Sequence, residues 1–249
     1  MIERFLPLAA SEHAREFDAV LLWVHVHMLI QAIAWGAFFM ICLVRFRRKA
    51  RPAASHAGVS PALPLLAIAF VVVGDAVLLA AMALPAWLKR SASPTAAERP
   101  IEVHVTADQF AWNIHYPGPD GSFGRTSSAL ISPSNPVGID RTSQDAGDDV
   151  GLLNVLVVPA GRPVIVQLTS RDVVHSFTLN EMRVRQDATP GFTVRTWFTP
   201  TATGQWEIAC SQLCGLGHYR MRGSFRVVTE AEWGQWLQRE VALITPARR

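Results

Sequence analysis

Residues 205–228, QWEIACSQLCGLGHYRMRGSFRVV, place a loop rich in potential metal ligands between two predicted strands. The flanking segments 205–209 and 223–228 contain β-branched and aromatic residues, which favours strands. Within twelve residues the loop carries two thiols, an imidazole and a thioether, at Cys210, Cys214, His218 and Met221. The sequence therefore predicts a β-hairpin whose loop binds a metal.

Two other interpretations of this loop stay open at the level of sequence. Cys210 and Cys214 could close a short disulfide, or the loop could form a structural zinc site. A disulfide would leave both His218 and Met221 without a role. A structural zinc site uses cysteine and histidine, so it would leave Met221 without one. Thiolate, imidazole and thioether together are the donors that copper prefers, so copper is the favoured metal.

Two long apolar segments dominate the first 90 residues. Residues 19–44 contain no Asp, Glu, Lys or Arg, and residues 63–88 contain only Asp75 among these types. About 20 apolar residues suffice to cross the hydrocarbon core of a bilayer. We therefore expect a two-helix transmembrane hairpin in residues 1–90, with spans at about 19–44 and 63–88, and a second domain in residues 91–249.

The formal net charge of +3 does not indicate a nucleic-acid partner, because the basic excess lies beside the first span. Residues 45–51, RFRRKAR, hold five basic side chains, whereas residues 91–249 hold 14 Lys+Arg against 15 Asp+Glu. Basic loops stay in the cytoplasm, so we expect loop 45–60 inside and both termini outside. The apolar run FLPLAA at 5–10 is short for a signal-peptide core, which predicts an ordinary outer N-terminus.

A polar linker, SASPTAAERP at 91–100, precedes a domain of short segments separated by turn signals. These segments are rich in β-branched and aromatic residues and span 101–105, 109–116, 152–158, 163–170, 192–198, 205–209 and 223–228. The pattern predicts an all-β sandwich or Greek-key barrel. The Pro/Ser/Asn/Asp/Gly-rich run 132–149 predicts a long loop, and a capping box at Thr229 and Glu232 predicts a short C-terminal helix.

A β-barrel with cysteine, histidine and methionine ligands near its C-terminal end suggests a cupredoxin, but a mononuclear blue-copper site uses one thiolate. Two thiolates can bridge two copper ions, and each ion then needs its own imidazole. His218 supplies one. The best candidate for the other is His175, in SRDVVHSFTL between two predicted strands.

The two spans, DVVHSFTL, RVRQDATPG and CSQLCGLGHYRM together closely resemble the cytochrome c oxidase subunit II family of the heme–copper oxidases, over nearly the whole chain. The resemblance implies a two-helix hairpin and a cupredoxin-like outer domain with a dinuclear copper centre, CuA. The resemblance implies six ligands. One is the main-chain carbonyl of Gln212, and the other five are the side chains of His175, Cys210, Cys214, His218 and Met221.

The resemblance also implies partners and a location. The implied partners are the lipid bilayer, subunit I with other oxidase subunits, and an electron donor that is a c-type cytochrome or a docked upstream respiratory complex. The heme and copper that reduce oxygen belong to subunit I, so this chain is expected to carry no catalytic oxygen site. The implied location is a bacterial-type inner membrane, with the CuA domain on the periplasmic side.

Several features depart from the family pattern, and two of them concern single residues of the outer domain. A glutamate that helps to hold magnesium at the boundary with subunit I is replaced by Gln212. A neutral amide is a weaker ligand for a hard cation, so we expect that magnesium position to be empty or weakly held. The aromatic segment that accepts electrons corresponds to QFAW at 109–112, where Phe110 replaces the first of two tryptophans and Trp112 keeps the second. We expect electrons to arrive through Trp112 or another route, and Phe110 is equally consistent with a core residue.

Polar residues inside the spans have several interpretations. Asp75 lies near the middle of the second span, where a carboxyl group is costly and usually faces protein or water. A hydrogen bond to subunit I and a role in proton handling both stay open. His25 and His27 are two residues apart and do not share a helix face, so we interpret them as packing or hydrogen-bonding residues.

Other functions compete with an oxidase subunit. The copper-containing nitric oxide reductases have an equivalent subunit with the same site, and only the heme and metal content of the partner subunit separates the two. A copper chaperone or thiol redox protein would also use a cysteine pair. Chaperones must release copper, however, whereas two histidines, two thiolates and a methionine would retain it.

Overall fold

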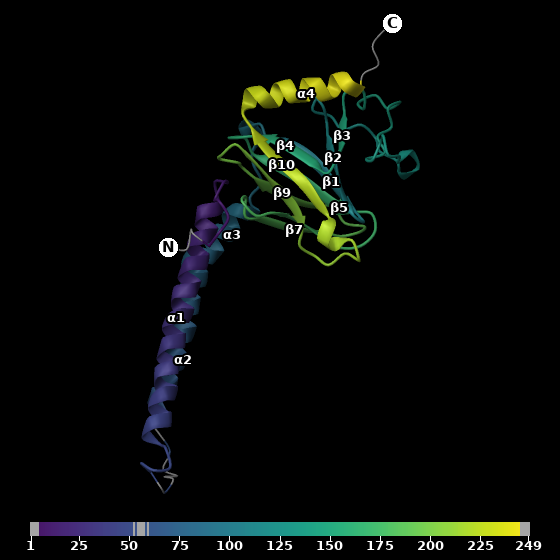
Figure 1. Cartoon of the computed structure of the whole chain (residues 1–249). Coiled ribbons are helices and arrows are strands. Elements are labelled where there is room, and N and C mark those ends of the chain that lie inside the picture. The colour runs from purple at the N-terminus through teal and green to yellow at the C-terminus, as the bar shows by residue number, and fades with distance from the viewer. Residues whose placement is uncertain (1–4, 52, 54–57, 59, 245–249) are drawn as a thin grey trace. The chain divides into compact units, whose positions relative to one another are not determined.

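The computed structural model describes residues 5–51, 53, 58 and 60–244, and the chain divides into two compact units (Figure 1). One unit consists of Glu16–Ser91. The other contains the segment up to Arg15 together with the chain from Ala92 onward. Much of the expected inner loop, at residues 52, 54–57 and 59, and both chain ends lie outside the described residues.

The first unit is a pair of long helices. Helix α1 spans Ala14–Arg45, and the second helix is continuous through α2 (Ala62–Leu78), the π-helical segment η2 (Leu79–Ala83) and α3 (Leu84–Ser91). Both are long and apolar enough to cross a membrane. Both helices extend past the expected spans, because the polar residues that flank each span continue the helix. Lys89 Nζ of the second helix pairs with Glu16 Oε1 of α1 at 2.8 Å.

The second unit is a β-sandwich of two five-stranded sheets. The first sheet has the order β3-β2-β1-β5-β8 and the second β4-β10-β9-β6-β7. Strands β1 and β5, and strands β4 and β10, pair in parallel, and the other neighbours are antiparallel. The strands are β1 (Ile101–Asp108), β2 (Ala111–Tyr116), β3 (Val150–Leu153), β4 (Val155–Pro159), β5 (Val164–Ser170), β6 (His175–Leu179), β7 (Val184–Ala188), β8 (Val194–Phe198), β9 (Gly204–Cys210) and β10 (Arg222–Val228).

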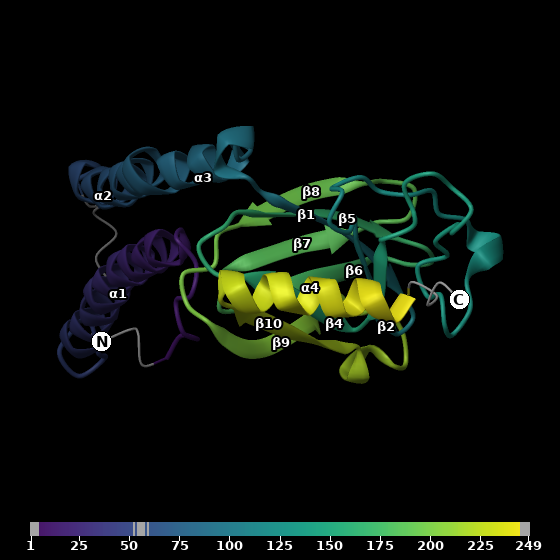
Figure 2. The same ribbon diagram turned by 90° about the horizontal axis from the view of Figure 1, so that it is seen from above.

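Short 3-10 turns and one helix complete this unit: η3 (Ala96–Glu98), η4 (Ser128–Leu130), η5 (His218–Arg220) and α4 (Glu230–Ile244). Figure 2 shows α4 crossing over the strands. The expected capping box begins α4, because Thr229 N–H and Oγ1 donate to Glu232 Oε2 at 2.9 and 2.8 Å and Glu232 N–H donates back to Thr229 Oγ1 at 3.3 Å.

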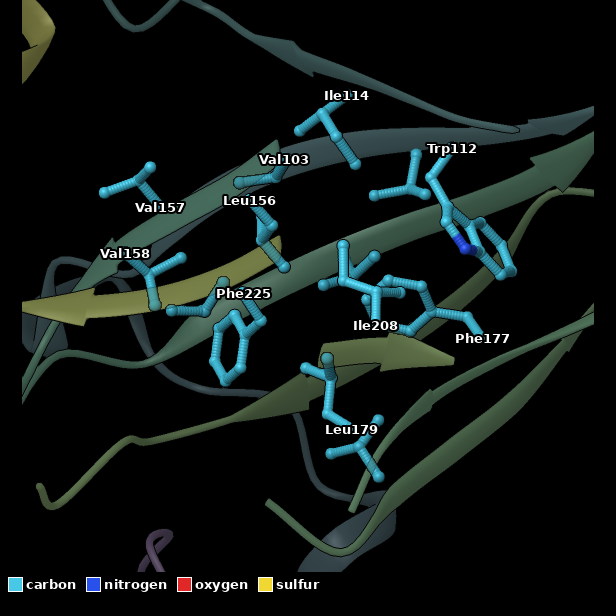
Figure 3. Close-up of a cluster of buried hydrophobic side chains, with 14 of the residues drawn as sticks. Val103, Trp112, Ile114, Leu156, Val157, Val158, Phe177, Leu179, Ile208 and Phe225 are labelled. Carbon is cyan, nitrogen blue, oxygen red and sulfur yellow. The ribbon is translucent and has the colours of Figure 1, made fainter. Parts of the chain in front are cut away.

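The hydrophobic core fills the space between the two sheets (Figure 3). Alternate residues of β1, beginning with Ile101, point inward and are buried. Aromatic rings from both sheets meet there, and Trp112 of β2 contacts Phe177 of β6 edge to face at 5.4 Å. Burying each large apolar side chain contributes about 1.5–3 kcal/mol, so this interface supplies most of the stability of the sandwich.

The hydroxyl of Tyr116 ties the sheets together. It donates to the carbonyl of Val157 at 2.9 Å and accepts from the backbone N–H of the same residue at 2.8 Å. Tyr116 belongs to β2 and Val157 to β4, which lie in different sheets. Burial raises the pKa of the Tyr116 hydroxyl above its ordinary value, so the group stays a donor. The same ring also packs against Trp233 and Trp236 of α4.

The strands differ from the expected ones in three places. Strands β6 and β7 were not expected, and His175 is the first residue of β6 rather than part of a connection. The expected strand 152–158 is divided between the two sheets at Asn154, whose φ of 59° breaks the extended backbone. Gln109 and Phe110 form the turn between β1 and β2 instead of beginning a strand.

Replacing Tyr116 with phenylalanine should lower the free energy of unfolding by about 1–3 kcal/mol, because the N–H and C=O of buried Val157 lose their partner. Urea unfolding of the full-length protein in detergent, followed by circular dichroism, measures the change. The other tyrosine gives a matched control: Tyr219 is 76% exposed, so Tyr219→Phe should leave stability unchanged. Equal stability of both variants would contradict the assignment.

Candidate metal centre

Three neighbouring strands position the candidate ligands. Strands β6 and β9 are antiparallel, and their register puts Phe177 opposite Cys210. His175 precedes Phe177 by two residues, so its side chain leaves the same face of the sheet. Strand β9 ends at Cys210 and β10 begins at Arg222, and the loop between these paired strands carries the other candidate ligands. The loop thus closes over the imidazole at the start of β6.

The two thiols lie at the centre of the cluster. Cys210 Sγ and Cys214 Sγ are 3.8 Å apart. Each has its own imidazole: His175 Nδ1 is 4.0 Å from Cys210 Sγ, and His218 Nδ1 is 3.6 Å from Cys214 Sγ. The ligand atoms of His175 and the two cysteines all lie within 4.8 Å of one another.

Two weaker donors complete the cluster. Met221 Sδ is 3.1 Å from His175 Nδ1 and 3.7 Å from Cys214 Sγ. The main-chain carbonyl oxygen of Gln212 is 3.2 Å from Cys210 Sγ, while the Gln212 side chain is exposed. The structure therefore brings together all six residues that the sequence singled out as ligands.

The chemistry of this donor set fits copper. His175, Cys214 and Met221 are buried, and Cys210 and His218 are partly buried. Burial, and after it the adjacent Cys210, together raise the pKa of the Cys214 thiol to about 11. Two neighbouring thiolates in this partly buried cluster would repel each other unless a cation bound both. Soft sulfur ligands with imidazoles and an axial thioether are the donors that copper takes.

Asp172 holds the His175 ring. Its Oδ1 lies 2.8 Å from His175 Nε2, so Nε2 carries the proton and the bare Nδ1 faces the sulfur atoms. The backbone N–H groups of Val173 and Gln109 donate to the same carboxylate at 2.6 and 2.7 Å. Burial opposes ionisation of Asp172, but the hydrogen bond from His175 and those from the backbone outweigh it and hold its pKa below the ordinary value.

The turn before β2 covers the loop. The side-chain amide of Gln109 donates to the carbonyl of Cys214, while its backbone N–H binds Asp172. The ring of Phe110 lies against Gly217, where any Cβ would overlap it. The guanidinium of Arg220 stands 5.8 Å from the centre of the same ring. Gly217 is therefore required for the close approach of Phe110 to the loop.

The structure separates the two candidate electron-accepting aromatics. Trp112 is fully buried, and its ring meets the His175 ring edge to face at 6.2 Å. Phe110 is only partly buried, and its ring packs against Gly217 of the loop and against the hydrophobic core. Only Phe110 of the pair can be reached by a docking protein.

The loop exposes an apolar surface. Leu213, Leu216 and Tyr219 are 77%, 97% and 76% exposed, although each lies within five residues of a candidate ligand. Large apolar side chains gathered on one exposed loop indicate a protein–protein contact site.

The fold and the ligand set define a membrane protein with a cupredoxin-like copper domain. A sequence model described as "Cytochrome C oxidase subunit II, periplasmic domain" matches residues 101–228. The chain belongs to the cytochrome c oxidase subunit II family, whose members are copper-containing membrane proteins of electron transport.

Two relatives and one solved structure illustrate the similarity. The "Alternative cytochrome c oxidase subunit 2" of Bradyrhizobium diazoefficiens is 33% identical over 204 residues, covering 82% of this chain and 72% of that protein. The "Cytochrome c oxidase subunit 2" of Cereibacter sphaeroides is 32% identical over 202 residues, covering 73% and 65%. The crystal structure of the periplasmic domain of subunit II of cytochrome oxidase of Bradyrhizobium japonicum is 29% identical, with a TM-score of 0.43, over 58% of this chain and 95% of that one.

Several contributors to the site were missed from the sequence. Asp172, Gln109 and Arg220 were given no role. The partners of Gln109 and Arg220, namely Cys214 and Phe110, lie about 100 residues away in the chain. One signal was available for Asp172: a carboxylate three residues before a candidate histidine ligand commonly orients it.

Replacing Asp172 with asparagine should weaken copper retention by roughly 10–100-fold, because His175 loses the charged partner that fixes its ring. Competition of the copper-loaded protein with a chelator, followed by absorbance, measures the change. Asp187 is an exposed carboxylate on β7, so Asp187→Asn provides a matched control. Equal retention in both variants would show that Asp172 does not support the metal ligands.

Proposed function

We propose that this chain is the electron-transfer subunit of a respiratory cytochrome c oxidase. It takes electrons from a c-type cytochrome, or from a docked upstream respiratory complex, at a dinuclear copper centre and passes them to a heme in the catalytic subunit. The observation that carries the proposal is the convergence of two imidazole Nδ1 atoms on two adjacent thiols, one imidazole to each thiol.

The proposed ligands comprise four strong donors and two weaker ones. The thiols of Cys210 and Cys214 and the imidazoles of His175 and His218 would hold the copper pair, with one imidazole beside each thiol. Met221 would add a weak thioether donor beside His175, and the main-chain carbonyl of Gln212 would be the sixth ligand. When bound, the copper pair supplies a one-electron redox couple shared between two metals.

The protein keeps the ligands in one arrangement. His175 is fixed by Asp172, and the loop is fixed by the Gln109 side chain and the Phe110 ring. A stiff ligand set changes little when an electron arrives, which keeps reorganisation small. Burial of His175 and Met221 excludes water from that side of the centre.

In this proposal electrons pass through the surface formed by the loop between β9 and β10 and the turn between β1 and β2. Phe110 is the partly exposed aromatic residue of that turn and contacts Arg220, and the ring of buried Trp112 contacts the His175 ring. The apolar side chains of Leu213, Leu216 and Tyr219 provide a contact surface for a partner. In this proposal the ligands described above all bind the electron-accepting copper pair. Oxygen reduction is therefore assigned to the partner subunit.

The proposed location follows the charge pattern of the sequence. The hairpin crosses a bacterial inner membrane twice, loop 45–60 lies in the cytoplasm, and the β-sandwich in residues 91–249 lies in the periplasm. The corresponding subunit of a nitric oxide reductase would carry the same centre. The relatives named above are cytochrome c oxidase subunits, which favours the oxidase.

Replacing Cys214 with serine should abolish the electron paramagnetic resonance signal of one unpaired electron shared by two copper ions, because one of the two thiols that hold the copper pair is lost. Met221→Leu should keep the shared signal and change only the reduction potential, because an axial thioether binds weakly. Spectra and copper content of the purified full-length protein give both results. A mixed-valence signal that survives in Cys214→Ser would falsify the assignment of Cys214 as a ligand.

Replacing Gln212 with glutamate should create tighter magnesium binding in the assembled complex without altering the copper spectrum. The copper ligand at this position is the backbone carbonyl, which glutamate keeps, whereas magnesium favours the carboxylate that glutamine lacks. Divalent-metal content after chelator treatment, compared between wild type and Gln212→Glu, measures the effect. Equal, stoichiometric, chelator-resistant magnesium in both proteins would contradict the expectation.

A further inference from the structure

Two titratable side chains meet between the long helices, far from the copper ligands in the chain. His27 Nε2 of α1 lies 3.3 Å from Asp75 Oδ1 of α2. Gly74 makes room for the imidazole, because a Cβ at that position would overlap the His27 ring. Phe70, one turn before Gly74 in α2, contacts the same ring, with the ring centres 5.5 Å apart. The pair is therefore a built feature of the hairpin, which neither helix forms alone.

The pair lies near the middle of both helices. At 1.5 Å per residue, Asp75 is about 20 Å from Ala62 and about 24 Å from Ser91, where the second helix ends. His27 is similarly about 20 Å from Ala14, where α1 begins. Because the hydrocarbon core is about 30 Å thick, both side chains lie deep within it.

A net charge at this depth is costly. With one proton between them, the two groups are neutral overall, as carboxylic acid with imidazole or as carboxylate with imidazolium. Within the two spans as expected from the sequence, the other titratable side chains are His25 and Cys42. His25 is exposed and its Nδ1 bonds to the carbonyl of Leu21 in its own helix, so it does not share this proton.

We propose that His27 and Asp75 form a proton-binding site in the middle of the membrane, in which the two side chains share one exchangeable proton. Transfer within the pair breaks the O–H bond of Asp75 and forms an N–H bond at Nε2 of His27, with no other reactant. The two atoms are close, but Nε2 has no aligned hydrogen-bond partner among the described residues.

The proton exchanges from the aspartate side. The His27 side chain is 12% exposed and enclosed between the helices, whereas the Asp75 side chain is 64% exposed on the surface of the hairpin. The exposed carboxyl is open there to a polar group of a neighbouring membrane protein. The π-helical segment η2 begins four residues after Asp75, and the Asp75 carbonyl accepts from the N–H of Leu79. Such π segments occur frequently at functional sites.

Infrared difference spectra of the full-length chain in lipid nanodiscs, recorded between acidic and alkaline pH, test the proposal. The wild type should show the carbonyl stretch of a protonated carboxyl group, which shifts in D2O. Asp75→Asn should lose this band, and His27→Gln should keep it with a shifted pH midpoint. His25→Gln is the matched control and should leave both band and midpoint unchanged. The measurement needs neither copper nor a partner, so its outcome is independent of the proposed function.

Two results would overturn the shared proton: a band that persists in Asp75→Asn, or a midpoint that His27→Gln leaves unchanged. If Asp75→Asn fails to accumulate in the membrane, Asp75→Glu replaces it. This variant keeps the carboxyl group and lengthens its side chain, so the band should move to a new frequency. An unmoved band would then assign the signal to another carboxyl and contradict the proposal.

Discussion

The antiparallel pairing of β6 with β9 is the contact on which the metal centre depends. It sets Phe177 opposite Cys210 and so brings His175 to the loop that follows β9, although the two proposed ligands, His175 and Cys210, are 35 residues apart in the chain. A slip of one residue in this register would turn His175 to the opposite face of the sheet. The buried Phe177 ring, packed against Trp112 in the core, opposes such a slip.

A second set of contacts converts this register into a fixed ligand geometry. Gln109 binds Asp172 with its backbone and Cys214 with its side chain, so one residue connects the carboxylate behind His175 to the cysteine loop. Gln109 stands in the turn between β1 and β2, in the other sheet. The geometry of the centre thus depends on the packing of the two sheets. A weaker contact between the sheets should change the positions of the proposed ligands.

Much of this arrangement could be predicted from the sequence, for physical reasons that also explain the misses. Segments rich in valine, isoleucine and aromatic residues were recognisable as strands, and the capping box at Thr229 marked α4. Strand β7 was missed because its central residues are polar and its stability comes from pairing with β6. The six candidate ligands came from local spacing and family resemblance. Asp172 carried one local signal, its position three residues before His175, whereas the contact of Arg220 with Phe110 is a tertiary contact that no local pattern encodes.

The same limit explains the interpretation of His27 and Asp75. Their sequence positions show that each lies within a span, but only the alignment of the two antiparallel helices places one beside the other. Glycine at position 74 is the local sign of that alignment, because a larger side chain would displace the imidazole. Once adjacent, the groups can neutralise each other by sharing a proton, which lowers the cost of placing each in the hydrocarbon core. A polar pair that would be unremarkable in water thus becomes a site with its own chemistry in the membrane.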